Sequence, residues 1–243
     1  MKIRIIGKCG PYAKANEACS CYLLNIGGKN VVLDMGNGSL AKLQNFISMG
    51  EIDAIILSHL HFDHISDIFI LKYGLINMKN KSMLDKKIKL FMPEEPQSIA
   101  SLVADHTLFD ITYMKDGLSL DLFGGIAKFR QMTHPVVSYG VSIRKEGKKF
   151  VYTGDTNYNE RLEKFMWQAD LLLVDGGLLE QDGGKAAPHL TVKQAAMLGH
   201  RAEAKQTVIT HLSPLYTYDQ IREECVSFPN ALVANEFDQF TVE

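Results

Sequence analysis

The chain has 243 residues, 46% of them hydrophobic and 22% charged, with a formal net charge of -2. This composition excludes a small fold that needs disulfides for stability, and the charge gives no general attraction for a polyanion. Apolar runs are shorter than the roughly 18 residues of a membrane span, and residues 1–6 are too short and too charged for a signal peptide. We therefore expect a soluble cytoplasmic protein with no membrane partner.

The first part of the chain alternates strand and helix patterns. Its apolar periodicity predicts strands at residues 2–7, 20–26, 29–34, 54–57 and 88–92. Gly27 and Gly28 form the expected hairpin turn between the second and third of these strands. The helical patterns of this part lie near residues 40–49, at 65–73 and from about Pro96.

The second part of the chain is rich in strands before it returns to alternation. Strands are predicted at residues 111–114, 118–122, 126–131, 136–144, 149–153, 171–175 and 207–210, and helices at 160–168, 191–201 and from Asp219. No repeat or linker divides the chain, so we expect a single domain over residues 1–243. Strand-rich stretches that lead into helices predict an α/β fold, a four-layer αββα sandwich.

The four cysteines show neither CxxC spacing nor a dense framework. Cys19 and Cys21, two residues apart on a predicted strand, are interpreted as small core residues. A run of lysines at positions 79, 81, 86, 87 and 89 is interpreted as a solvated loop before a strand. His106 and His200 match no motif, and we expect them to be surface or helix residues.

The strongest local signal follows the buried strand at residues 54–57. His59, His61, Asp63 and His64 lie within six residues of one another. Buried together without partners, they would cost free energy, so a metal site explains the motif better than histidines placed by chance in a polar loop. Imidazole and carboxylate suit zinc, manganese or iron, and the absence of thiolates argues against a structural zinc knuckle.

Further candidate ligands follow later strands. His134, Asp155 and His211 each come after a predicted strand, although a lone histidine at a strand end is more often a hydrogen-bonded structural residue. Seven candidates suit two metal ions that share one carboxylate. The full set is His59, His61, Asp63, His64, His134, Asp155 and His211.

The run His-x-His-x-Asp-His, with the later His134, Gly154-Asp155-Thr156 and Thr210-His211-Leu212, resembles the metallo-β-lactamase superfamily over nearly the whole chain. The segments 133–140 and 187–191 resemble its phosphodiesterase branch, which includes ribonuclease Z and cyclic-nucleotide phosphodiesterases. This resemblance implies two divalent ions, zinc first and manganese as the alternative.

The resemblance also assigns the ligands. It implies one ion on His59, His61 and His134, the other on Asp63, His64 and His211, and Asp155 with an attacking hydroxide bridging both.

The resemblance assigns roles to three more side chains. Asp63 would also help to orient the nucleophile, as a catalytic residue as well as a ligand. His189 would protonate the leaving oxygen, although a histidine that merely precedes a helix capped by Thr191 is the alternative. Asp34 would orient ligand histidines, or it would close a turn after its strand.

The expected substrate follows from the absence of a segment that many ribonuclease Z enzymes carry. Many ribonuclease Z enzymes carry a long basic arm between the third histidine ligand and the bridging aspartate, whereas here twenty residues separate His134 from Asp155 and are used by two strands. Polyanion affinity needs cationic contacts, so we expect a small phosphodiester, first a cyclic nucleotide. Candidate stacking aromatics are Phe123, Tyr139, Tyr152, Tyr158 and Tyr216, although core packing is the default for most of them.

Three other functions stay open. They are transfer RNA 3′ processing, with tRNA as the partner, hydrolysis of an ester, lactone or thioester, and a metal-binding module without catalysis. Members of the phosphodiesterase branch are often dimers, so a homodimer is expected by the same resemblance.

Overall fold

The computed structural model describes residues 1–184 and 186–242, which form two seven-stranded sheets. The first sheet has the strand order β14 (Gln239–Thr241), β1 (Lys2–Gly7), β2 (Cys21–Ile26), β3 (Lys29–Leu33), β4 (Ile52–Ile56), β5 (Ile88–Met92) and β6 (Phe109–Tyr113). The second has the order β13 (Ala231–Val233), β12 (Thr207–Thr210), β11 (Leu171–Asp175), β10 (Lys148–Tyr152), β9 (Tyr139–Lys145), β8 (Gly125–Gln131) and β7 (Ser119–Leu122).

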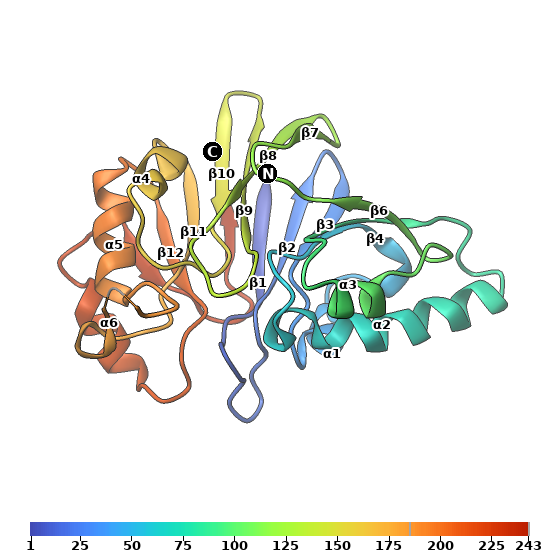
Figure 1. Cartoon of the computed structure of the whole chain (residues 1–243), viewed down its shortest axis with the longest axis horizontal. Coiled ribbons are helices and arrows are strands. Elements are labelled where there is room, and N and C mark those ends of the chain that lie inside the picture. The colour runs from blue at the N-terminus through green and yellow to red at the C-terminus, as the bar shows by residue number, and fades with distance from the viewer. Residues whose placement is uncertain (185, 243) are drawn as a thin grey trace.

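Helices cover the outer face of each sheet (Figure 1). Those beside the first sheet are α1 (Ser39–Leu43), α2 (Phe62–Asn80) and α3 (Gln97–Val103). Those beside the second are α4 (Arg161–Met166), α5 (Val192–Arg201) and α6 (Tyr218–Cys225), and two short 3₁₀ helices are Met49–Glu51 and Glu180–Asp182. The predicted αββα sandwich is confirmed.

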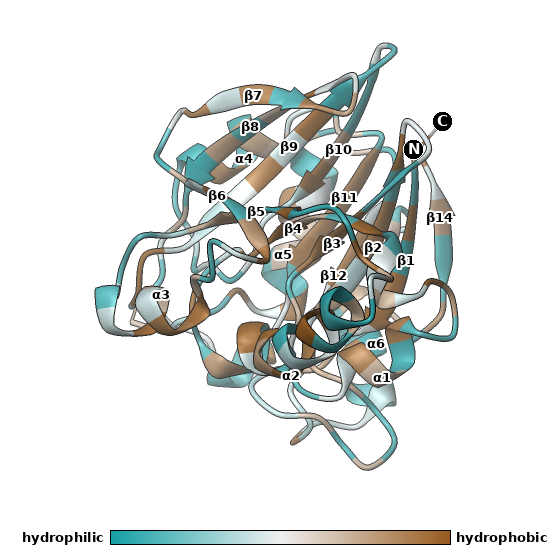
Figure 2. Ribbon diagram, turned by 90° about the vertical axis from the view of Figure 1, so that its right-hand side faces the viewer, coloured by the Kyte–Doolittle hydropathy of each residue, from teal (hydrophilic) through white to brown (hydrophobic). Residues whose placement is uncertain are grey.

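Three clusters of buried apolar residues correspond to the three boundaries between the layers. One joins the facing sides of the two sheets and includes Tyr22, Phe129 and Phe150. The others join each sheet to its own helices, with Ile68 in the first half and Leu198 in the second. The brown strands of both sheets in Figure 2 show this concentration of hydropathy inside the sandwich. Burial between layers is the main favourable contribution to this fold.

Several predicted boundaries were wrong. The helix expected at 40–49 ends at Leu43, because Ser48 and Glu51 form a capping box that starts a separate 3₁₀ turn. The strand expected from residue 136 begins at Tyr139, where its pairing with Gln131 of β8 starts. α2 is longer than the predicted 65–73 because His61 serves as its N-cap. β13 and β14 were not predicted, since three-residue strands carry too little periodicity.

The cysteines, and the two histidines that match no motif, lie where the sequence predicts. Cys19 and Cys21 are buried, and no disulfide occurs among the described residues. His106 and His200 are exposed, the latter on α5. No helix in the part of the chain that the structure describes is long and apolar enough to cross a membrane.

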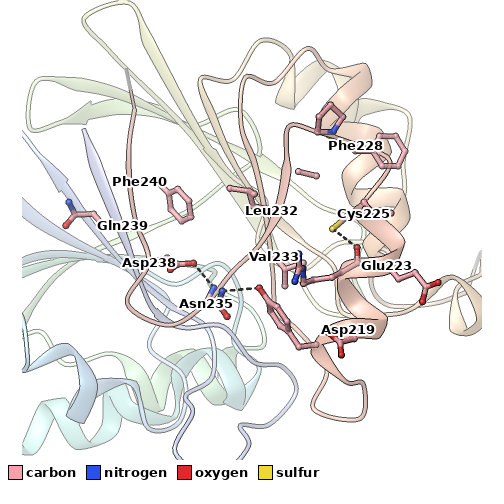
Figure 3. A pocket seen from close by; sticks show the side chains of 15 residues that line it. Asp219, Glu223, Cys225, Phe228, Leu232, Val233, Asn235, Asp238, Gln239 and Phe240 are labelled. Atoms are coloured by element: carbon pink, nitrogen blue, oxygen red, sulfur yellow. Dashed lines mark hydrogen bonds between the residues drawn. The ribbon is translucent and has the colours of Figure 1, made fainter.

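A groove of about 720 Å³ lies where the chain passes from the second sheet back to the first (Figure 3). Its walls are α6, β13 and β14, and Leu232 and Phe240 face it from the two edge strands. Asn235 in the connection donates to the hydroxyl of Tyr218 at 3.0 Å, which fixes the turn against α6. The lining contains none of the candidate metal ligands, so the chemistry of the motif lies elsewhere.

Candidate metal centre

The histidine motif lies directly after β4, where the chain turns into α2. His61 is the N-cap residue of α2, and Asp63 and His64 occupy its first turn. The carbonyl of His64 accepts from the backbone N–H of Met35 at 2.7 Å, and His64 itself is fully buried. The tight passage from strand to helix therefore places four candidate side chains at one end of the first sheet.

The remaining candidates come from the same end of the second sheet. β10, β11 and β12 run parallel, so Asp155 and His211, which follow β10 and β12, meet at their carboxyl ends. His134 lies in the loop after β8. The structure thus gathers all seven sequence candidates, which we call the His/Asp cluster. Its members are His59, His61, Asp63, His64, His134, Asp155 and His211.

Asp155 stands at the middle of the His/Asp cluster. Its Oδ2 lies 3.3 Å from Nε2 of His64, 3.3 Å from Nε2 of His211 and 3.5 Å from Nε2 of His59. The neighbouring carboxylate of Asp63 lies 3.5 Å from Nε2 of His64. The carboxylate of Asp155 therefore lies close to two histidines of the motif after β4, His59 and His64, and to His211 from the second sheet.

The other half of the His/Asp cluster is a group of three imidazoles. Nδ1 of His61 lies 3.1 Å from Nε2 of His59 and 3.2 Å from Nε2 of His134. These ring nitrogens, together with Asp63, His64, Asp155 and His211, fall into two groups in which the ligand atoms lie within 4.8 Å of one another. Two such groups side by side could hold two ions.

Several polar atoms of the His/Asp cluster are buried and have no hydrogen-bond partner among residues 1–184 and 186–242. They are Nε2 of His64, Nε2 of His211 and Oδ1 of Asp155. Desolvated lone pairs are costly unless a proton or a cation meets them. The donor set is imidazole nitrogen and carboxylate oxygen, which fits zinc and related divalent ions. The cluster is therefore able to bind metal ions.

The outward nitrogens of the ligand histidines are held by other groups. Nδ1 of His59 lies 3.0 Å from Oγ of Ser58, Nδ1 of His211 lies 3.1 Å from Oγ of Ser20, and Nδ1 of His134 lies 3.1 Å from the carbonyl of Pro188. Such contacts fix ring orientation and leave the inward nitrogen for a metal. Sequence reasoning did not identify these serines, because nothing in their local pattern marks them.

Asp34 performs the same task for His64. Its Oδ2 lies 2.8 Å from Nδ1 of His64 and also accepts from the hydroxyls of Ser58 and Tyr152, at 2.8 and 2.5 Å. Asp34 is fully buried, with a positive φ of 54°. Its carboxylate thus contacts other elements and holds the ring of His64, a candidate ligand, as the resemblance implied.

Protonation in the His/Asp cluster follows burial and charge. Burial, followed by the neighbouring charge of His64, holds the pKa of His59 and His211 well below the usual value, so both are neutral. Burial opposes charge on His64 too, but the carboxylates of Asp155 and Asp34 outweigh it and raise its pKa well above the usual value. The position between these carboxylates therefore favours positive charge.

His189 lies beside the His/Asp cluster with its side chain 16% exposed. Its Nδ1 is 3.0 Å from Oδ2 of Asp175 and 3.8 Å from Oδ2 of Asp155, and its ring stacks on that of His211 at 4.9 Å. Although burial lowers the pKa of His189, Asp175 outweighs it and raises the pKa to about 9. Thr191, two residues on, caps α5 as expected, but His189 itself faces the cluster.

Asp175 is the main residue that sequence reasoning missed. It ends β11 and is fully buried, and its carboxylate also accepts from the backbone N–H groups of Thr156 and Gly177, both at 3.0 Å. These bonds fix the carboxylate that holds Nδ1 of His189. The available signal was its place at the end of a buried strand, before two glycines.

Most of the candidate aromatics are not placed for stacking, in line with the expectation that core packing is their default. Tyr139 and Tyr152 belong to the core between the sheets. Phe123 precedes β8, whereas His134 follows it, so the two lie at opposite ends of that strand. The hydroxyl of Tyr216 donates to Asp182 at 2.7 Å. Tyr158 is exposed, and so is Phe62, which the sequence reasoning overlooked although it stands between His61 and Asp63.

Gly10 is required by the position of His211. A Cβ at residue 10 would lie 1.9 Å from Cε1 and 2.1 Å from Nε2 of that ring. We expect Gly10→Ala to displace His211 and to weaken metal binding, measured by metal content after dialysis against a chelator. Gly184→Ala is the matched control, because no atom lies within 4 Å of its added Cβ. Equal metal retention by the two variants would contradict the assignment.

The connection between β9 and β10 is as short as expected. Glu146 and Gly147 form a two-residue turn with φ values of 53° and 77°, which is the geometry of a tight hairpin. No arm therefore interrupts the chain between His134 and Asp155.

Comparison with known proteins places these observations in a family. Residues 29–212 match the family described as the beta-lactamase superfamily domain. The probable metallo-hydrolase YhfI of Bacillus subtilis (strain 168) is 29% identical over 249 residues, covering 96% of each protein. Ribonuclease Z of Archaeoglobus fulgidus is 23% identical, covering 97% of this chain and 96% of that protein.

Solved structures agree with the observed fold. The crystal structure of YhfI from Bacillus subtilis matches with a TM-score of 0.90 and 26% identity over 98% of each chain. The short form of human tRNase Z matches with a TM-score of 0.78 and 20% identity over 100% of each chain.

Proposed function

Because the chain belongs to the beta-lactamase superfamily of metal-dependent hydrolases, we propose that it is a binuclear phosphodiesterase that hydrolyses small phosphodiesters, first cyclic nucleotides. Membership of the family agrees with the resemblance that the motifs indicate. The observation that carries the proposal is Asp155, whose Oδ2 lies within 3.5 Å of histidines from both halves of the His/Asp cluster.

The ligand assignment follows the two groups of side chains. His59, His61 and His134 would hold one divalent ion, and Asp63, His64 and His211 the other, with Asp155 shared. Zinc is proposed first and manganese second. Two such ions bring an attacking water to near-neutral pKa and stabilise charge on a phosphoryl group. The protein would hold the rings of the ligand histidines in orientation through contacts with Asp34, Ser58, Ser20 and the carbonyl of Pro188.

Two side chains are proposed to act on the reacting groups. His189, held at Nδ1 by Asp175, presents its other nitrogen for protonation of the leaving oxygen. Asp63 would bind an ion with His64 and His211, because its carboxylate lies 3.5 Å from Nε2 of His64 and 3.8 Å from Nε2 of His211. By the family resemblance it would also orient the attacking water. His189 would therefore deliver a proton to the leaving group, and Asp63 would position the nucleophile.

The size of the substrate is proposed from the surroundings. The hairpin after β9 carries no arm, and part of the lysine run is already engaged: Lys86 pairs with Asp53 at 2.9 Å, and Lys79 donates to the carbonyl of Thr107. Phe62, 64% exposed beside His61, offers an aromatic face on which a base could stack. A small phosphodiester with one base suits these features better than a folded RNA.

Transfer RNA 3′ processing is the second candidate. It is favoured by the 23% identity to the ribonuclease Z of Archaeoglobus fulgidus over nearly the full length of both chains. Hydrolysis of an ester, lactone or thioester, and metal binding without catalysis, are the remaining alternatives.

A side-by-side assay of metal-loaded protein tests the ranking. We expect cyclic nucleotides to be hydrolysed and a precursor tRNA with a 3′ trailer to be cut poorly, at low and at physiological salt. Phosphate contacts weaken steeply with salt, so a true tRNA substrate would show a strong salt dependence. Efficient, salt-sensitive cleavage of the tRNA with negligible cyclic-nucleotide turnover would favour the second candidate. Absence of turnover on bis(p-nitrophenyl) phosphate as well would favour the module without catalysis.

We also propose that the chain forms a homodimer. Ile70 and Tyr73, neighbours on α2, and Leu102 on α3 expose apolar surface of the kind that interfaces use. A solution molar mass of one chain, 27.2 kDa, measured by light scattering at micromolar concentration, would exclude it.

A further inference from the structure

A second pocket, with a strong positive charge, is lined by none of the residues of the His/Asp cluster. It has a volume of about 510 Å³ and lies on the outer face of the second sheet, between β8, β9 and β10 and helix α4. Figure 1 shows α4 beside the end of β10. Six of its lining side chains are cationic and one is anionic, in a chain whose net charge is -2. The cations are Lys128, Arg130, Arg144, Lys149, Arg161 and Lys164. We call this the cationic pocket.

Few of these cations have a counter-ion. Arg130 pairs with Asp116, the single carboxylate of the lining, at 3.4 Å. Lys128, Arg144, Arg161 and Lys164 have no carboxylate within 4.0 Å among residues 1–184 and 186–242. Four exposed cations that line one concavity without an ion pair repel one another, and a bound anion would reduce that cost.

Lys149 and Arg144 place two positive charges side by side on neighbouring strands of the sheet. They are direct cross-strand partners of β10 and β9, an arrangement in which like charges destabilise the pairing. Lys149 is only 4% exposed, and its ammonium donates to the carbonyls of Phe165 and Trp167 at 2.8 and 2.7 Å. Burial, and then the charge of Arg144, lower the pKa of Lys149 to about 8. The ammonium group of Lys149 is therefore held in one position beside the charge of Arg144, with no ion pair to a carboxylate among the described residues.

The remaining lining limits the ligand to a small organic molecule. Met132 and Leu162 are buried, and the half-buried Phe165 approaches Gly140 so closely that a Cβ there would lie 3.0 Å from its ring. These side chains make up the apolar part of the lining. Guanidinium groups bind both carboxylate and phosphate oxygens in a bidentate manner, and a phosphate group brings more negative charge to several cations than one carboxylate does.

We propose that the cationic pocket binds a small molecule that carries two or more phosphate charges and an apolar or aromatic group. The phosphates contact Arg144, Arg161, Lys128 and Lys164, and the organic part packs on Met132, Leu162 and Phe165. The lining of the cationic pocket shares no residue with the His/Asp cluster, although Met132 of the lining lies two positions before His134. Binding in the pocket does not depend on which reaction the metal centre performs.

The test is a calorimetric titration of the metal-loaded protein with adenosine 3′,5′-bisphosphate, which contains no phosphodiester bond. We expect the double substitution Arg144→Gln with Arg161→Gln to weaken binding at least about tenfold, because two charge-assisted contacts are lost. The matched control, Arg222→Gln with Lys87→Gln, removes two exposed charges outside the pocket and should bind as the wild type does. Asp155→Ala should retain the binding, since it alters only the metal centre.

Thermal unfolding supplies a second readout that does not depend on affinity. Without ligand, Arg144→Gln is expected to melt at a higher temperature than the wild type, because it removes the like-charge pair with Lys149. The bisphosphate should raise the melting temperature of the wild type and not that of the double variant.

Three results would overturn the proposal. They are equal affinity of the wild type and the Arg144 and Arg161 double variant, loss of binding in Asp155→Ala, and displacement of the bisphosphate by single-stranded poly(U) at lower phosphate concentration. The first two would assign the binding to the metal centre or to general surface charge. The third would assign the cationic pocket to a nucleic-acid backbone.

Discussion

Asp155→Ala is expected to reduce the metal content from two ions per chain to one or none and to abolish most of the turnover. The carboxylate of Asp155 lies within 3.5 Å of Nε2 of each of His59, His64 and His211. Its loss leaves two clustered sets of imidazoles without the anion that lies between them. The fall in activity should exceed the roughly 100-fold that losing an outer partner of a metal ligand causes.

Metal analysis of desalted protein and turnover of bis(p-nitrophenyl) phosphate measure this effect. Asp110→Ala, which removes an exposed carboxylate from β6, serves as the control and should keep both ions. A wild type that holds one ion, together with an Asp155→Ala variant of unchanged metal content and activity, would refute the binuclear arrangement.

His189→Ala is expected to keep both metal ions and to lower turnover by roughly 10² to 10⁴, the usual effect of losing a general acid or base. The reason is its position: Nδ1 is held by Asp175 at 3.0 Å, while the ring stacks beside His211 at the edge of the His/Asp cluster. The loss should shrink for p-nitrophenyl esters, whose leaving group needs little protonation.

The metal content of His189→Ala decides between two roles. His189 also lies close enough to His134 and Asp155 to form a third possible group of ligands, but its Nδ1 is already committed to Asp175. Loss of an ion would therefore make His189 a ligand instead of a proton donor. An equal loss of activity for good and poor leaving groups would indicate that it positions the substrate, and unchanged activity would leave it as a residue before a helix. His200→Ala, an exposed histidine on α5, is the control.

The sequence by itself determined the sandwich fold and the members of the His/Asp cluster. Apolar periodicity is local, so strands such as Ile88–Met92, Leu171–Asp175 and Thr207–Thr210 were predicted with their observed bounds. The cluster could be predicted because its ligands follow buried strands, and because His59, His61, Asp63 and His64 are crowded into one short run. Both signals are carried by neighbouring residues.

The tertiary structure alone decided which groups support the cluster and which surfaces carry charge. Asp175 holds His189, Tyr152 donates to Asp34 across 118 positions of the chain, and Gly10 lies against His211 across 201 positions. The cationic pocket likewise joins β8, β9, β10 and α4. Exposure and contact between distant segments depend on how the sheets and helices pack, and no local pattern encodes that packing.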